Sequence, residues 1–104
     1  MNNKMTTEKI KNQKEHSIFI GGKPLMNYVT SVITQFNTGA SEVTIKARGK
    51  FISKGVDVAE VTRRKFFEDK NISLGDISIG SEEFKNKEDK IINISTIEII
   101  LKNN

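Results

Sequence analysis

The chain has 104 residues, of which 36% are hydrophobic and 29% are charged, and its formal net charge is +4. This length fits one domain with a core of its own, and the basic excess favours an anionic partner. The absence of cysteine excludes disulfides, thiolate zinc sites and cysteine nucleophiles. No apolar run approaches the roughly 18 residues that a membrane-spanning helix needs, and no signal-peptide core follows Met1. We therefore expect a cytoplasmic protein.

The first 15 residues are polar, without glycine or proline, and show no period. They are predicted to form a flexible N-terminal tail, which leaves residues 16–104 as the single domain. Residues 17–20 read as a short strand that ends at Gly21 and Gly22. Pro24 fits the first turn of a helix, and Gly39 fits a left-handed cap at its end. Between them, apolar residues recur at helical spacing: Leu25, Tyr28, Val29, Val32, Ile33 and Phe36. The turn before this helix could also hold an anion with its backbone N–H groups.

Residues 42–48 alternate as a strand with one buried face, with Val43, Ile45 and Ala47 inward. The opposite face and the following turn carry four cations within nine residues and no acid: Lys46, Arg48, Lys50 and Lys54. Cations held in this way by a rigid element suit contact with phosphates. A solvated charged face with no ligand is the alternative interpretation.

A second helix is predicted from a cap at Ser53 to about Phe67, with apolar residues on two sides. It would pack on the sheet and on something else. Its basic end, residues 63–65, also suits the helix dipole. Two strands follow, at residues 72–80 and 91–101. In the last strand, Ile92 and Ile94 occupy even positions, whereas Ile97, Ile99 and Leu101 occupy odd ones. Either a hairpin that projects free of the core or a bulge would explain this change.

The predicted order is βαβαββ, an α/β two-layer sandwich (α+β) with the helices on one side of a sheet. Catalysis is not expected, since no nucleophile, base and orienting group can be assembled. His16 is the only histidine and makes a poor metal ligand or base alone. Asp57 and Glu60 are interpreted as charge balance on a basic helix. We therefore expect no enzyme, cofactor or metal site.

The chain resembles the Alba family of archaeal nucleic-acid-binding proteins. The matching segments are residues 18–29 (IFIGGKPLMNYV), residues 41–54 (SEVTIKARGKFISK), Val56 and Asp57 with Phe66, and residues 95–99 (STIEI). The resemblance implies a fold similar to the C-terminal domain of translation initiation factor three. It also implies a homodimer whose long hairpins, formed by the last two strands, reach out as arms. Such dimers bind double-stranded DNA and RNA with little sequence preference.

By position, the resemblance assigns phosphate contacts on the body to Lys23, Arg48 and Lys50. It places Lys85, Lys87 and Lys90 on the arm, which would follow the minor groove. To this nucleic-acid-binding set we add Asn27, Lys46 and Lys54. Phe66, with Arg63, would make the contact between neighbouring dimers. Where many family members have two adjacent lysines, of which the first can be acetylated, this chain has Gly22 and Lys23, so only the second lysine remains.

The expected function is the packaging of chromosomal DNA in the archaeal nucleoid. An RNA-binding protein, an RNA chaperone or a subunit of an RNA-processing particle is the alternative. A protein–protein scaffold that uses the basic surface for acidic partners is a third possibility.

Overall fold

The computed structural model describes residues 16–65 and 72–103. The predicted tail, residues 1–15, and the predicted helix end at Phe66 and Phe67 lie outside these ranges. The elements follow the predicted order, with a short 3-10 turn in addition: β1 (Ser17–Phe19), α2 (Leu25–Asn37), β2 (Glu42–Arg48), η1 (Gly49–Phe51), α3 (Ile52–Lys65), β3 (Ile72–Lys85) and β4 (Ile91–Asn103).

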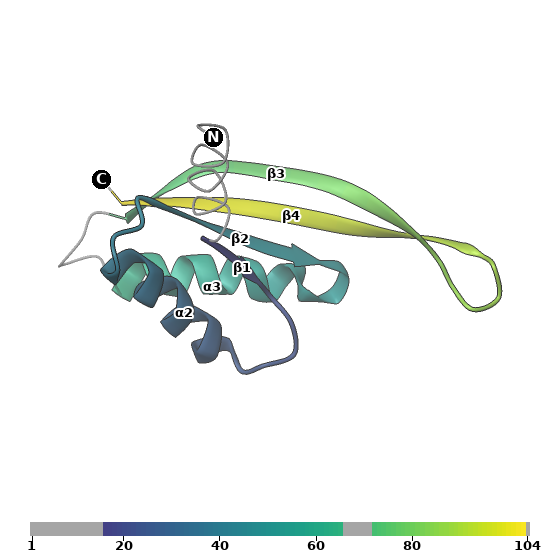
Figure 1. The fold of residues 1–104 in the computed structure, drawn as a ribbon, viewed down its shortest axis with the longest axis horizontal. Coiled ribbons are helices and arrows are strands. Elements are labelled where there is room, and N and C mark those ends of the chain that lie inside the picture. Colours follow the sequence, from purple (N-terminus) through teal and green to yellow (C-terminus); the bar gives the residue numbers. More distant parts are fainter. Residues whose placement is uncertain (1–15, 66–71, 104) are drawn as a thin grey trace, which may run out of the picture.

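The four strands form one sheet in the order β1-β2-β4-β3. β1 pairs parallel with β2, and the other two pairings are antiparallel. Both helices lie on the same face of this sheet (Figure 1), so the predicted two-layer arrangement is confirmed. The other face has no helix on it in the described part of the chain and is called the outer face below.

The core lies between the helices and the two central strands. Val43 and Ile45 of β2 are fully buried, as are Val29 and Val32 of α2 and Leu101 of β4. These are the inward positions that strand alternation and helical spacing predict. Each such side chain contributes roughly 1.5–3 kcal/mol by leaving water, and that burial holds β2 rigidly in the middle of the sheet.

The helix ends differ slightly from the sequence prediction. Pro24 is the N-cap of α2, one position before the first turn. Gly39 has a φ of 109°, as predicted for a left-handed position after the helix. The predicted cap at Ser53 is wrong, since α3 already begins at Ile52. Gly49, with a φ of 58°, turns the chain directly into η1, so helical structure starts before Ser53.

The last two strands are longer than predicted and form a projecting hairpin. β3 runs to Lys85 instead of Gly80, and it stays paired with β4 as far as Lys85 opposite Ile91. The far end of the hairpin extends well beyond the body as an arm (Figure 1). A register shift lies between Leu74 and Ile77 of β3. Because β4 itself continues without a break, the projecting arm explains its change of apolar parity, and the bulge belongs to β3.

Candidate nucleic-acid interface

Three cations lie where the β1–α2 loop, η1 and the start of α3 meet. Lys54 Nζ donates to the carbonyl oxygens of Gly21 at 2.9 Å and of Lys23 at 2.8 Å. The Nζ atoms of Lys50 and Lys54 lie 5.4 and 5.7 Å from the centre of the Phe51 ring. We call Lys23, Lys50 and Lys54 the loop cluster. Lys54 thus positions the loop that carries Lys23, besides adding its own charge.

The Tyr28 side chain also holds the β1–α2 loop in place. Its hydroxyl oxygen accepts from the backbone N–H of Gly21 at 2.9 Å and of Lys23 at 3.1 Å. The side chain is buried, which agrees with its predicted place in the core. The anion cradle suggested by the sequence would lack these two N–H groups, because Tyr28 already uses them. The loop therefore presents side-chain charge more than backbone donors.

Asn27 is exposed in the first turn of α2, close to Lys23. These two residues, with Tyr28, Thr30 and Ser31, line an open hollow of about 330 Å³. The structure thus brings Asn27 and Lys23 together at one edge of the loop cluster. This arrangement was predicted only in part, because the sequence alone did not place Asn27 toward the loop.

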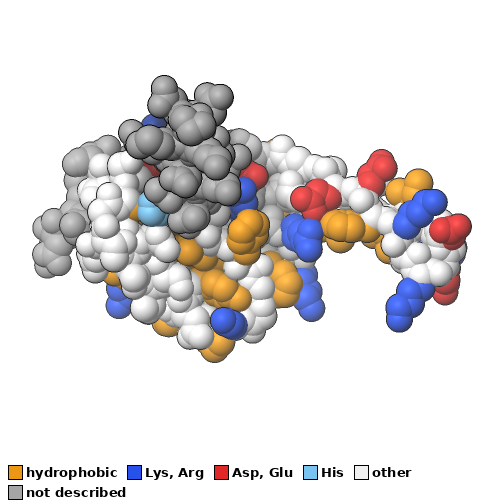
Figure 2. Space-filling model, in the orientation of Figure 1, with side chains coloured by type: hydrophobic (Ala, Val, Ile, Leu, Met, Phe, Trp, Pro, Cys, Tyr) orange, Lys and Arg blue, Asp and Glu red, His pale blue; other side chains and the backbone are white. Residues whose placement is uncertain are grey.

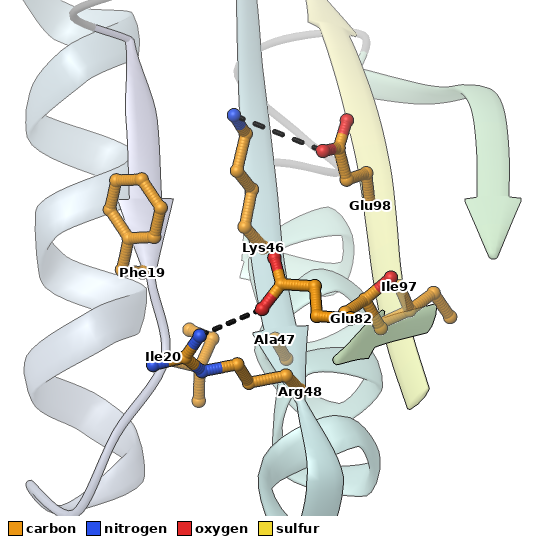
Figure 3. Close-up of a pocket in the computed structure, with 9 residues that line it drawn as sticks. Phe19, Ile20, Lys46, Ala47, Arg48, Glu82, Ile97 and Glu98 are labelled. Carbon is orange, nitrogen blue, oxygen red and sulfur yellow. Dashed lines mark hydrogen bonds and ion pairs between the residues drawn. The ribbon is translucent and has the colours of Figure 1, made fainter. Parts of the chain in front are cut away.

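Lys46 and Arg48 lie on the outer face of β2, and each has an acidic partner. Lys46 Nζ is 3.9 Å from Glu98 Oε2 of β4, and Arg48 Nη1 is 2.8 Å from Glu82 Oε1 of β3 (Figure 3). The Arg48 guanidinium also lies 5.2 Å from the centre of the Phe84 ring. Exposed ion pairs of this kind contribute only about 0–1 kcal/mol. A polyanion could therefore replace the carboxylates.

Lys50 differs from these strand cations. It is exposed, and within residues 16–65 and 72–103 it has no acidic partner within ion-pair distance. The left-handed conformation of Gly49 places it just beyond the end of β2. Lys50 is thus available to a ligand without the loss of an existing ion pair.

The arm carries its predicted lysines at and beyond the end of β3. Lys85 ends the strand, while Lys87 and Lys90 belong to the connecting turn. The Asn86 side-chain oxygen accepts from the N–H groups of Glu88 and Lys90, both at 2.9 Å, and so shapes this turn. Lys85 Nζ lies 3.8 Å from Asp89 Oδ1. Acidic and basic side chains are mixed at the tip of the arm (Figure 2), so its net attraction for phosphate is weaker than its lysines alone would give.

The remaining predicted residues lie away from the loop cluster or outside the described ranges. Arg63 is half-buried, and its Nη1 lies 2.6 Å from Glu60 Oε2, which supports charge balance as the role of Glu60. Phe66 lies outside the described ranges. His16 Nδ1 is 2.7 Å from Gln35 Oε1. The described part of the chain holds no group of three or more His, Cys, Asp or Glu residues suited to a metal.

Sequence reasoning missed four residues beside the strand cations: Phe19, Glu82, Phe84 and Glu98. Their position on the outer face depends on the register between distant strands. Lys46 is paired in register with both Phe19 and Glu98, but a single sequence does not reveal that register. The apolar residues at positions 97, 99 and 101 are a signal that could have placed Glu98 on the opposite face of the last strand.

Comparisons with known proteins agree with one another. The family model for Alba matches residues 16–81. "DNA/RNA-binding protein Alba 1" of Archaeoglobus fulgidus is 53% identical over 87 residues, which cover 84% of this chain and 94% of that protein. "DNA/RNA-binding protein Alba" of Methanocella arvoryzae is 51% identical over 89 residues, covering 86% and 91% of the two chains.

Solved structures show the same relationship at the level of the fold. Alba from Thermoplasma volcanium superposes with a TM-score of 0.75 at 49% identity, covering 83% of this chain and 98% of that one. ALBA1 from Trypanosoma brucei gives a TM-score of 0.65 at 18% identity, covering 85% and 68%. The second similarity concerns the fold alone.

Proposed function

This chain belongs to the Alba family, and we propose from that premise that it binds double-stranded DNA and RNA with little sequence preference. The observation that carries the proposal is the loop cluster. Lys23, Lys50 and Lys54 are held by a buried tyrosine, a positive-φ glycine and two carbonyl contacts. The backbone that carries these lysines is thereby held in place, so their charges are gathered at one surface before a phosphate backbone arrives. The names of the relatives, which specify DNA and RNA, support the same ligand.

In this mechanism the body binds by neutralising phosphates and releasing their counterions. The contacts would be Lys23, Lys50 and Lys54 of the loop cluster, with Asn27 beside them, and then Lys46 and Arg48 once their carboxylates have been displaced. Only three of the 17 basic residues are arginine. Lysines act as point charges and suit phosphate contact, whereas the bidentate reading of guanine favours arginine. Binding of this kind distinguishes sequences poorly.

We further propose that the arm follows the minor groove through Lys85, Lys87 and Lys90. In the structure the arm reaches beyond the body (Figure 1), so it could contact phosphates that the loop cluster does not. Its tip carries both signs of charge. The arm would therefore add reach and orientation, while the body supplies most of the electrostatic affinity.

A homodimer is part of the proposal, and the uncovered apolar face of β3 supports it. Leu74, Ile77 and Ile79 pair in register with Leu101, Ile99 and Ile97 of β4, and so share the side of the sheet that the helices cover elsewhere. All three stay exposed, Ile79 to 82%. An apolar row of this size on an edge strand is costly in water unless a second surface covers it. A second copy of the chain, with the same row, is the proposed cover. Contact between dimers through Phe66 and Arg63 remains a prediction, as does the place of the protein in the nucleoid.

The test of phosphate binding is a salt titration of affinity for a random-sequence DNA duplex. Lys50→Ala should weaken binding to unrelated sequences alike and reduce the slope of log K against log salt by about 0.9. Lys102→Ala is the matched control, since Lys102 is also an exposed lysine but is paired with Glu42 at the opposite end of β2. An unchanged slope for Lys50→Ala, or an equal change for both variants, would contradict the proposed role of the loop cluster.

A further inference from the structure

Phe19 is an aromatic residue on the outer face, and the residue remains 70% exposed. Lys46 Nζ lies 5.5 Å from the centre of its ring, but most of the residue is still in contact with solvent. Single exposed apolar side chains are common on proteins and do not by themselves indicate a site. The surroundings of this ring are therefore the informative observation.

An open hollow of about 300 Å³ lies beside the ring. Its polar lining comes from three strands: Lys46 and Arg48 of β2, Thr96 and Glu98 of β4, and Glu82 of β3 (Figure 3). This volume is at the lower end of the range for small-molecule sites, which begins at roughly 300 Å³. An aromatic face, two cations, two carboxylates and a hydroxyl thus surround one small space.

The charges of the hollow are balanced, and this argues against an isolated phosphate as its occupant, because such an anion lacks the charge density and counterion release with which a duplex could displace the two carboxylates. Lys46 is close to Glu98, and Arg48 is close to Glu82, so a phosphate placed in the hollow would also face two carboxylates. A nucleobase is neutral and carries donors and acceptors on its edge. Carboxylates accept from exocyclic amino groups, arginine donates to base oxygen and nitrogen, and aromatic rings stack on the face of any base.

We propose that this hollow binds an unpaired nucleobase of single-stranded RNA or DNA, stacked on the ring of Phe19. A base within a duplex is already stacked on both faces and has its pairing edge occupied, so the ligand must be unpaired. Lys46, beside the ring, would neutralise an adjoining phosphate once it leaves Glu98. The inference rests on the proposed binding of nucleic acid, but it uses the outer face of the sheet instead of the loop cluster.

The experiment compares the full chain with Phe19→Leu and Phe19→Tyr. The probes are a single-stranded RNA and a single-stranded DNA of the same sequence, each with one 2-aminopurine, whose fluorescence falls when it is stacked. A random DNA duplex is titrated in parallel. Phe19→Leu should weaken single-strand binding by about 5- to 100-fold with loss of the fluorescence change. Phe19→Tyr should retain both, and duplex affinity should be the same in all three proteins. The RNA and DNA probes show which of the two strands the site prefers.

The outcomes separate this inference from the proposed function. Duplex binding without single-strand binding overturns the inference and leaves the proposed function standing. Single-strand binding that Phe19→Leu leaves unchanged, or an equal loss for single strands and duplex, also overturns it. Loss of single-strand binding in Phe19→Leu, with no duplex binding by any of the proteins, supports the inference and contradicts the proposed duplex function. Cooperative thermal unfolding of both variants, with midpoints equal to that of the unsubstituted protein, establishes that both are folded.

Discussion

Arg48 is already engaged in an ion pair before any ligand binds. Its guanidinium is held by the Glu82 carboxylate and lies against the Phe84 ring, both on β3. Lys50, two residues further on, has no acidic partner in the described ranges. Two cations that look equivalent in the sequence are therefore different in the structure. Arg48 must exchange one anion for another, whereas Lys50 only gains one.

Replacing Glu82 by glutamine should strengthen binding to duplex DNA by about 1.5- to 5-fold, because an exposed ion pair of up to about 1 kcal/mol no longer competes for Arg48. The same salt titration measures this change. Glu42→Gln provides the control, since its partner Lys102 lies at the opposite end of β2. An equal gain in both variants would show that net charge alone is responsible and would contradict the competition.

The shared outer face of Lys46 and Arg48 could be predicted from the sequence, because strand alternation fixes the face of each residue in β2. Their acidic partners could not. Glu82 is 34 residues away from Arg48 in the chain, and its position depends on how β3 and β4 align, which includes a register shift. The same reason applies to Phe19 and Glu98.

At the scale of elements, α3 approaches β2 unusually closely at Gly55. A Cβ atom built on Gly55 would lie 3.0 Å from the Cβ of Ala47. The absence of a side chain therefore lets the helix pack directly on the strand that carries Lys46 and Arg48. The distance between α3 and β2 also determines where η1 and the loop cluster lie relative to the sheet.

Replacing Gly55 by valine should lower the free energy of unfolding by about 1–2 kcal/mol. Overpacking lowers the stability by roughly 1–3 kcal/mol, while the better helix propensity of valine raises it by only a few tenths of a kcal/mol. Chemical denaturation measures the loss. A valine at Gly22, where a Cβ would meet no atom within 4 Å, should cost much less. Equal stability of the two variants would contradict close packing at Gly55.

Most elements could be predicted because their periodicity is strong. The apolar stripe of α2 and the alternation of β2 predict the bounds of these two elements to within a residue or two. The far half of β3 was missed because residues 81–85 are mainly polar and show no alternation, so that only their pairing with β4 makes them a strand. Ser53 was mistaken for a cap because the effect of Gly49 on the preceding turn leaves no periodic signal.

At the scale of the whole molecule, one side of the sheet is only partly covered in the described chain. Helices cover its centre, and the part that belongs to β3 is left uncovered. The helices contact β2 and β4, whereas the apolar row of Leu74, Ile77 and Ile79 on β3 stays exposed. Packing within one chain therefore leaves apolar area on the edge strand. The proposed dimer would cover it and set the two arms at a fixed separation.

A glutamate in place of Ile79 should convert the proposed dimer to a monomer. The side chain is exposed in the single chain, so the charge costs little there, whereas within an apolar interface an unpaired carboxylate costs several kcal/mol. Light scattering during size-exclusion chromatography measures the mass. Met26→Glu, at another exposed apolar position, should leave the mass unchanged. A wild-type protein that elutes as a monomer, or an Ile79→Glu variant that remains dimeric, would contradict this interface.

The ion pairs of Lys46 and Arg48 with Glu98 and Glu82 must be displaced before these cations can bind another anion. A ligand therefore needs a certain charge density to bind to them. A small anion or a single carboxylate offers these cations little more than they already have, so it gains almost nothing by entering. A duplex presents one charge for about every 1.7 Å of its axis and releases condensed ions when it is bound. This pair of strand cations should therefore ignore the abundant weak anions around it and respond to polymers of high charge density, without any need to recognise a sequence.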